Sequence, residues 1–290
     1  MTAASGAGDR GPAGDDRLVA LDVDGTLLTS AEQLAPRVRA SLGAAANAGW
    51  HLVLVTGRPL AIALPVVHDL ALGEYLVAAN GATVATVADG AVLYQASLPG
   101  ATVVATLTAA RAAVPGLGLA VTSPRGFFRE PGFAGIAPLS ETEGTEVADA
   151  MPEADDLVHS AVLFVDGLDA RELQRRLEPL LPPEVAVTPS GLPGSVELTA
   201  PGIHKGSGLA WLCGRIGVDA AAVVAFGDGL NDHEMLTWSG WGVAMGNAEP
   251  VTQELADEVT ASNDEDGVAL VLERLLADDR ATAAKRDDRG

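Results

Sequence analysis

The sequence predicts an α/β protein in which a doubly wound parallel sheet is interrupted by a smaller, inserted α+β domain. Over residues 17–82 and again over 193–277, short apolar strands alternate with helical segments. This alternation favours a parallel sheet that is covered by helices. Residues 83–192 instead hold closely spaced strand candidates, which is typical of a separate layer of adjacent antiparallel strands. Residues 1–16 are expected to form a disordered tail and residues 278–290 a charged, frayed tail.

The first segment is expected to supply three strands and two helices. Residues 18–22 form an apolar run that is too short for a helix, and residues 51–55 and 75–79 resemble it. Between these strands, residues 31–49 carry apolar side chains at helical spacing and close on a glycine. Residues 60–72 are also expected to be helical, so the order is strand, helix, strand, helix, strand.

The inserted domain and the last segment continue the pattern in different ways. In the insert, we expect helices over residues 101–113 and 169–181, with residues 117–122 and 127–129 paired as a hairpin. Further strands are expected over residues 90–98, 159–165, 185–188 and 195–198. In the last segment, residues 205–216, 233–239 and 268–277 are expected to be helices, and residues 221–226 and 242–245 strands.

The composition excludes several classes of partner. The chain has 18 basic and 39 acidic residues, which gives a net charge of -21. Such a surface repels nucleic acid backbones and anionic lipid headgroups, so neither nucleic acid nor membrane is expected as a partner. The single cysteine, Cys213, excludes an internal disulfide and favours a reducing, cytoplasmic location. We expect a monomer or a homodimer.

Two carboxylates at the end of the first strand are the strongest functional signal. Asp22 and Asp24 directly follow a buried apolar run and precede Gly25. Because side chains alternate along a strand, both can project from the same side at its carboxyl end, where open parallel sheets bind ligands. An acidic turn would give the same local pattern, since Asp-Gly is a common turn dipeptide. Two like charges this close favour a bound cation.

Three later stretches place further polar residues where they could meet these carboxylates. Thr56 follows the second strand, Lys205 begins a helix, and Asp228 and Asp232 follow a later strand. The carboxyl ends of parallel strands converge on one crevice. A few carboxylates with a phosphate oxygen suit Mg²⁺, while a hydroxyl and a lysine suit phosphate oxygens. Together they point to phosphoryl transfer through an aspartyl intermediate.

The order of these motifs resembles that of the haloacid dehalogenase (HAD) superfamily and, within it, the Cof-type or class IIB sugar-phosphate phosphatases. The resemblance implies a Rossmann-like HAD core with an inserted C2-type cap, and a small phosphorylated metabolite as substrate. The flanking pairs and runs that begin at residues 80, 242 and 262 fit the same subgroup. The four motifs are Asp22-Val23-Asp24-Gly25-Thr26, Thr56-Gly57-Arg58, Lys205-Gly206 and Gly227-Asp228-Gly229-Leu230-Asn231-Asp232.

The resemblance also implies a role for each catalytic carboxylate. Asp22 would be the nucleophile and a magnesium ligand. Asp24 would protonate the leaving oxygen and then activate water, while its backbone carbonyl binds the metal. Asp228 would complete the protein ligands of the metal, and Asp232 would support the site.

The remaining motif residues would hold the transferring phosphoryl group or support the site. Thr56, Gly57 and Lys205 would bind the phosphate. Arg58 could contact the substrate or form a structural ion pair. Asn231 could bind the substrate or cap a helix. Gly25 would support the turn after the first strand.

Two other functions use the same residue types. A phosphomutase would pass the phosphoryl group from the aspartyl phosphate to a sugar hydroxyl instead of water. A receiver-like signalling domain would keep the phosphoryl group on its acceptor aspartate. Asp24 argues against the receiver, because receivers lack such a general acid and need no inserted cap. Sugar phosphates and cofactor phosphates both remain open as substrates.

Overall fold

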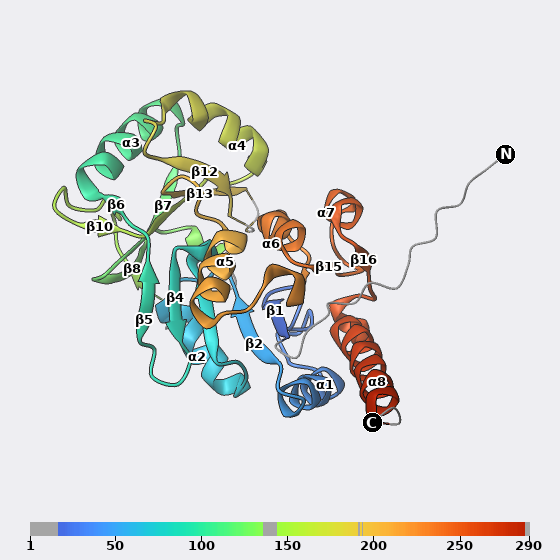
Figure 1. The fold of residues 1–290 in the computed structure, drawn as a ribbon. Helices are drawn as coiled ribbons and strands as arrows, with labels where there is room; N and C mark the ends of the chain where they lie inside the picture. Colours follow the sequence, from blue (N-terminus) through green and yellow to red (C-terminus); the bar gives the residue numbers. More distant parts are fainter. Residues whose placement is uncertain (1–16, 136–143, 191, 193, 288–290) are drawn as a thin grey trace.

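The eight-stranded sheet at the centre of the molecule is the scaffold on which the site is built. The computed structural model describes residues 17–135, 144–190, 192 and 194–287. All neighbouring strands from β16 to β3 run parallel, and β4 and β5 are added antiparallel at one edge. In spatial order the strands are β16 (Glu258–Val259), β15 (Trp241–Ala244), β14 (Val223–Gly227), β1 (Leu18–Asp22), β2 (His51–Val55), β3 (Tyr75–Ala78), β4 (Thr83–Thr86) and β5 (Val92–Gln95) (Figure 1).

Alternation along the central strand β1 explains why helices cover both faces of this sheet. Val19 and Leu21 pack into one apolar cluster, and Leu18 and Ala20 pack into another on the opposite face. The first cluster is completed by α1 (Pro36–Asn47), α2 (Leu60–Leu70) and α8 (Gly267–Asp287). The second is completed by α5 (Lys205–Ile216) and α6 (His233–Trp238). The doubly wound parallel sheet expected from the sequence is therefore confirmed.

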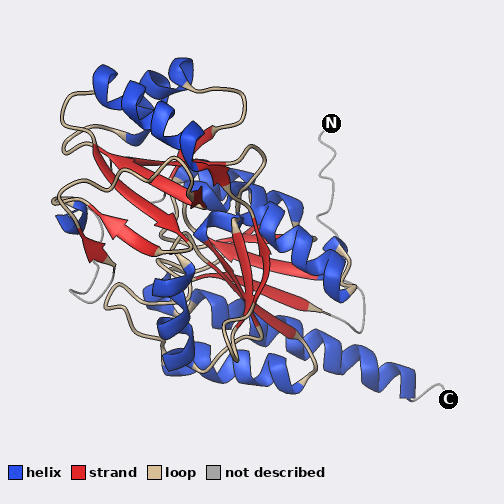
Figure 2. Cartoon of the chain, turned by 90° about the vertical axis from the view of Figure 1, so that its left-hand side faces the viewer, coloured by secondary structure: helices blue, strands red, loops and turns tan. Residues whose placement is uncertain are grey.

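A six-stranded sheet forms the second layer and covers the site. Its neighbours are antiparallel except for β8 and β9. Helices α3 (Gly100–Ala113) and α4 (Ala170–Leu177) cover its outer face, as Figure 2 shows in the turned view. In spatial order the strands are β12 (Ala186–Pro189), β13 (Ser195–Thr199), β11 (Ser160–Phe164), β7 (Gly118–Ser123), β8 (Gly126–Arg129) and β9 (Thr145–Glu146).

Several short elements complete the described chain. Strands β6 (Leu98–Pro99) and β10 (Leu157–Val158) pair with each other beside α3, and helix α7 (Pro250–Leu255) follows β15. None of the described helices combines the length and the apolar character that crossing a bilayer requires. Single 3₁₀ turns are formed by Ala79–Gly81, Phe133–Gly135, Glu178–Leu180, Ala220–Ala222, Leu230–Asp232 and Asn263–Glu265.

The strand pairings move both expected boundaries of the insert. Strands β4 and β5, which lie within the range expected for the insert, extend the first sheet by pairing antiparallel next to β3. Strand β13, which lies after residue 192, pairs with β11 and β12 in the second sheet. The chain therefore leaves the first sheet after Gln95 and the second sheet after Thr199. Short apolar strands look alike in sequence, so their partners could not be read from it.

Two helix boundaries also differ from expectation. Helix α1 begins at Pro36 rather than at residue 31, because proline is favoured in the first helical turn and disfavoured further inside. Helix α8 continues through residues 278–287, which were expected to be a frayed tail. An ion pair of 2.7 Å between Arg17 and Asp279 ties this extension to the residue that precedes β1. Residues 1–16 and 288–290 lie outside the described residues.

Candidate active site

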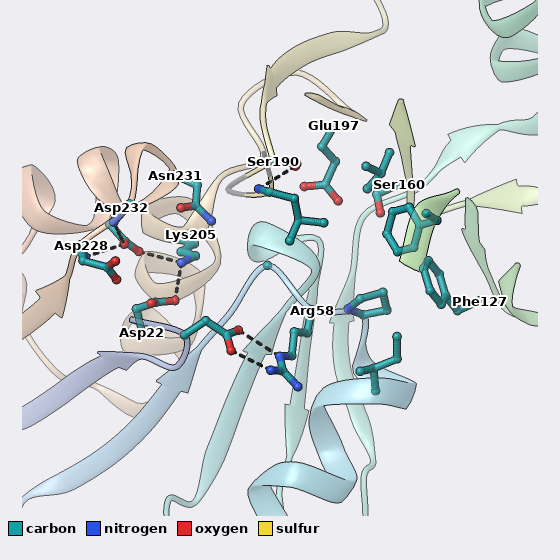
Figure 3. Close-up of a pocket in the computed structure, with 18 residues that line it drawn as sticks. Asp22, Arg58, Phe127, Ser160, Ser190, Glu197, Lys205, Asp228, Asn231 and Asp232 are labelled. Carbon is teal, nitrogen blue, oxygen red and sulfur yellow. Dashed lines mark hydrogen bonds and ion pairs between the residues drawn. The ribbon is translucent and has the colours of Figure 1, made fainter. Parts of the chain in front are cut away.

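A cavity of about 210 Å³ lies where the carboxyl ends of β1, β2 and β14 face the second sheet (Figure 3). On the side of the first sheet it is lined by charged and polar residues. On the side of the second sheet its lining is mostly apolar. The two groups come from segments that are far apart in the sequence, so the cavity exists only in the folded chain. The predicted site residues in its lining are Asp22, Asp24, Gly57, Arg58, Lys205, Asp228, Asn231 and Asp232.

A buried lysine holds two carboxylates at the floor of the cavity. The Nζ atom of Lys205 lies 2.5 Å from Oδ1 of Asp22 and 2.7 Å from Oδ1 of Asp232. All three side chains are buried. Lys205 occupies the first position of α5. His204 caps the start of this helix, because the Nδ1 atom of His204 accepts a hydrogen bond of 3.1 Å from the backbone N–H of Ser207. The helix start thus fixes where the ammonium group lies.

The loop after β14 is held in shape by Asp232. Its Oδ2 atom accepts hydrogen bonds from the backbone N–H of Asp228 at 3.0 Å and of Gly229 at 2.8 Å. Asp228 in turn accepts a bond of 2.8 Å from the Thr26 hydroxyl. Because both oxygens of Asp232 already have partners in the protein, this side chain positions the loop and the lysine.

Three carboxylates lie close enough together to share a metal ion. Asp22, Asp228 and Asp232 each place one ligand oxygen within 4.8 Å of the others. Gly25 makes room for this cluster: it has a φ of +81°, and a Cβ there would lie 2.3 Å from Oδ2 of Asp228. Its carbonyl accepts a bond of 2.8 Å from Asn247. Hard carboxylate oxygens of this kind fit Mg²⁺.

The charges in this cluster shift the proton affinities of its members. Burial raises the pKa of Asp22 well above its usual value, although Lys205 acts in the opposite direction. Burial and the charge of Asp232 raise the pKa of Asp228 to about 6. Burial would lower the pKa of Lys205, but the charges of Asp22 and Asp232 outweigh it and the pKa is raised. One ammonium group does not balance these carboxylates, so an added cation would be stabilised here.

Asp24 and Arg58 form an ion pair at the mouth of the cavity. The guanidinium donates two hydrogen bonds, of 2.9 Å from Nε and 2.7 Å from Nη2, to the two carboxylate oxygens of Asp24. The Asp24 side chain is half exposed. Of the two interpretations of Arg58, the structure contains the ion pair. Thr56 lies beneath this point, where its buried hydroxyl accepts a bond of 3.1 Å from the backbone N–H of Arg58.

Glu197 and Asn80 are site residues whose roles could not be predicted from the sequence. Asn231 donates a hydrogen bond of 2.9 Å to the side chain of Asn80, which donates one to Glu197. Glu197 comes from β13 of the second sheet and lies in the cavity lining. Asn80 begins one of the flanking pairs that fit the HAD subgroup, whereas the only sequence signal of Glu197 is that it is an acidic residue within an apolar strand.

Aromatic side chains form the wall opposite the carboxylates. Phe127 and Phe133 line the cavity with ring centroids 5.6 Å apart in an edge-to-face arrangement. Ile62 of α2 belongs to the same apolar cluster, so this cluster joins the two layers. Phe128 packs on the other face of its sheet, and Arg129 pairs with Glu146 at 2.6 Å.

Comparison with known proteins identifies relatives along almost the whole chain. A family model for haloacid dehalogenase-like hydrolases matches residues 19–272. YxeH of Bacillus subtilis (strain 168) is 31% identical over 278 residues, which cover 90% of this chain and 98% of that protein. The 5-amino-6-(5-phospho-D-ribitylamino)uracil phosphatase YcsE of the same organism is 29% identical over 258 residues, which cover 89% of this chain and 95% of that protein.

A solved structure shows the same fold. A sugar phosphatase described as HAD subclass IIB superposes with a TM-score of 0.77 at 24% sequence identity. The match covers 89% of this chain and 98% of that one. Because the match spans nearly all of both chains, it includes the second sheet as well as the first.

Proposed function

The chain belongs to the haloacid dehalogenase-like hydrolases, as its four motifs led us to expect, and from this premise we propose a Mg²⁺-dependent phosphatase that acts through an aspartyl phosphate. It is a phosphatase of small phosphorylated compounds, in keeping with relatives such as YcsE. The metal and the covalent intermediate are the parts that we propose. The observation that carries them is the contact between Lys205 and Asp22 beside Asp228.

We assign the nucleophile to Asp22. One carboxylate oxygen attacks phosphorus and the bond to the leaving oxygen breaks, which gives an aspartyl phosphate. Lys205 lies 2.5 Å from Oδ1 of Asp22, close enough to stabilise the charge on the transferring phosphoryl oxygens. Preorganised charge of this kind commonly contributes more to the rate acceleration of an enzyme than any other single effect.

We assign proton transfer to Asp24. It gives its proton to the leaving oxygen, and then takes a proton from the water that attacks the aspartyl phosphate. Its half-exposed carboxylate is held by Arg58 at the cavity mouth. Asp24 already belongs to the cavity lining, so its carboxyl group lies beside the bound phosphoryl group. The bond between phosphorus and the Asp22 oxygen breaks, phosphate is released and the Asp22 carboxylate is regenerated.

The donor set fits Mg²⁺, with Asp22 and Asp228 as the carboxylates that would hold it and the backbone carbonyl of Asp24 as a further oxygen. Asp232 is engaged by Lys205 and two backbone N–H groups, so we assign it a supporting role. When bound, the ion would neutralise charge on the nucleophile and on the phosphoryl oxygens.

The test is phosphate release from a panel of phosphorylated metabolites and an aryl phosphate, with Mg²⁺ or with chelator. We expect Mg²⁺-dependent release that Asp22→Asn lowers by about 10⁴-fold or more, because no other group can form the covalent bond. Asp155→Asn is the matched control, because this exposed aspartate lies outside the cavity. Transfer of the phosphoryl group to a second metabolite without phosphate release would indicate a mutase instead. A phosphoryl group that stays on Asp22 would indicate a signalling domain.

A further inference from the structure

Glu197 is a buried acidic residue in the cavity wall opposite the reacting carboxylates. It lies at the centre of β13, opposite Val162 of β11 and Thr188 of β12, and is 2% exposed. In Figure 3 its carboxylate points into the cavity from the side opposite Asp22 and Asp228. A leaving group bound to the phosphoryl group at Asp22 would extend towards it.

The hydrogen bonds to Glu197 leave acceptor capacity free for a ligand. Its carboxylate accepts one bond from the side chain of Asn80 and one from the hydroxyl of Ser160. An ionised carboxylate can accept about four hydrogen bonds. Burial raises the pKa of Glu197, and the two hydrogen bonds and the charge of Lys205 only partly oppose this shift. An additional donor would therefore stabilise this carboxylate.

The rest of the wall is apolar apart from two serines, whose hydroxyls already have partners: Ser160 bonds to Glu197, and Ser190 bonds to Ser195. Phe127, Phe133, Val162 and Leu192 contribute apolar side chains to it. The nearby guanidinium of Arg58 is bound to both oxygens of Asp24. In a small, mostly apolar pocket, a few polar groups decide which ligand is accepted.

We propose that Glu197 selects the leaving group: it accepts a hydrogen bond from an O–H or N–H of a neutral or cationic leaving group and rejects leaving groups that carry a carboxylate or a second phosphate. This inference rests on the proposed phosphatase function. It narrows the substrate class to compact phosphomonoesters with an apolar face and one hydrogen-bond donor. A buried carboxylate repels a second anion strongly because little water screens the two charges.

A matched set of aryl phosphates tests this selection. Phenyl phosphates with para methyl, hydroxymethyl, aminomethyl or carboxymethyl groups place the same ring against the aromatic wall and change the distal group. One methylene separates each polar group from the ring, so the phenol remains a similar leaving group throughout. For the wild type, we expect kcat/KM for the hydroxymethyl and aminomethyl esters to exceed that for the carboxymethyl ester by about 100-fold or more.

Two isosteric variants separate the effect of the charge inside the cavity from the effect of the overall charge of the sheet. Glu197→Gln removes the charge but keeps an acceptor, so we expect the preference against the carboxymethyl ester to fall at least about tenfold. Glu146→Gln is the matched control, because this exposed glutamate belongs to the same sheet and pairs with Arg129 outside the cavity. It should leave the preference unchanged.

The outcomes distinguish this inference from the proposed function. Release of phosphate from none of the esters would overturn the phosphatase assignment and this inference together. Release from all esters, with the carboxymethyl ester among the best substrates of the wild type, would overturn the selection by Glu197 but not the phosphatase assignment. This outcome is read from the wild type and does not depend on whether the variant folds. An equal loss of preference in Glu146→Gln would assign the effect to the overall charge and would also overturn it.

Discussion

The two walls of the cavity are built on different physical principles. On the first sheet, Asp22, Lys205 and Asp232 form a chain of short ionic contacts at the ends of strands and at the start of a helix. On the second sheet, Phe127 and Phe133 pack by shape, with Glu197 as the acidic side chain in that wall. The first wall tolerates little change because Lys205 is the counter-ion of two buried carboxylates at once. The second can change its side chains without disturbing the charges that act on phosphorus.

Removing the central charge of the first wall should have the largest effect. Lys205→Met leaves Asp22 and Asp232 buried without their counter-ion, so we expect the free energy of unfolding to fall by about 3 kcal/mol or more. We expect kcat to fall by about 10³-fold, as for other lost charge stabilisation. Urea unfolding and phosphate release measure the two effects.

The control for this change is Arg37→Met, which breaks an exposed pair with Glu273. There the loss should stay below about 1 kcal/mol. If both variants lost the same stability, Lys205 would not be the stabilising counter-ion of Asp22 and Asp232.

Replacing the proposed acid should have an effect that depends on the leaving group. Asp24→Asn cannot donate a proton, so we expect kcat to fall by roughly 10² to 10³-fold for alkyl phosphates. For p-nitrophenyl phosphate, whose leaving oxygen needs little protonation, the loss should be much smaller. Steady-state kinetics on both esters check this. Equal losses on the two would contradict the assignment of Asp24 as the acid.

A neighbouring pair of aromatic residues compares the cavity wall with the packing behind it. Phe127→Ala should raise KM for aryl phosphates about tenfold and cost about 3 kcal/mol of stability, because it removes a ring from both the cavity and the apolar cluster. Phe128→Ala is the matched control, since this ring packs on the other face. It should cost stability while KM stays unchanged. Equal changes in KM would show that the wall does not contact the substrate.

The smallest expected effect is a pH dependence of the metal-free protein. The pKa of Asp228 is raised from 3.8 to about 6, so between these values the folded state binds more protons than the unfolded state. Stability therefore falls as pH rises through this window. In chelator at pH 7, Asp228→Asn should be more stable than the wild type by about 1 to 2 kcal/mol.

This difference should disappear below about pH 3, where the carboxyl group is protonated in both states. The exposed Asp155→Asn should show no such change. Mg²⁺ should reverse the order at pH 7, because it stabilises only the protein that binds it. If Asp228→Asn were no more stable than the wild type in chelator, the destabilising burial and charge repulsion of Asp228 would be contradicted.

The sequence predicted the first wall better than the second. Asp22 and Asp228 directly follow apolar strands, and parallel strands bring their carboxyl ends to one edge. The position of these residues along the chain therefore determined their place in space. The buried Lys205 could be placed for the same reason, since α5 begins at that edge.

The second wall could not be predicted because its elements have no fixed relation to the first sheet in the sequence. Alternation along β13 shows that Glu197 lies on one face, but does not show that Asn80 and Asn231 cover that face. Residues 83–86 were not expected to form a strand, and the place of β5 in the first sheet was missed for a related reason, because a short apolar strand fits either sheet. Only contacts across the whole chain decide these cases.

The fate of the phosphoryl group on Asp22 tests the central proposal most directly. A single turnover of the wild type with Mg²⁺ and an aryl phosphate can be quenched at early times, reduced with borohydride and digested for mass spectrometry. Reduction converts an aspartyl phosphate to homoserine. We therefore expect homoserine at position 22 to appear before phosphate is released and to decline as phosphate accumulates. Phosphate release with Asp22 unmodified at every time point would contradict the covalent mechanism and indicate direct attack by water.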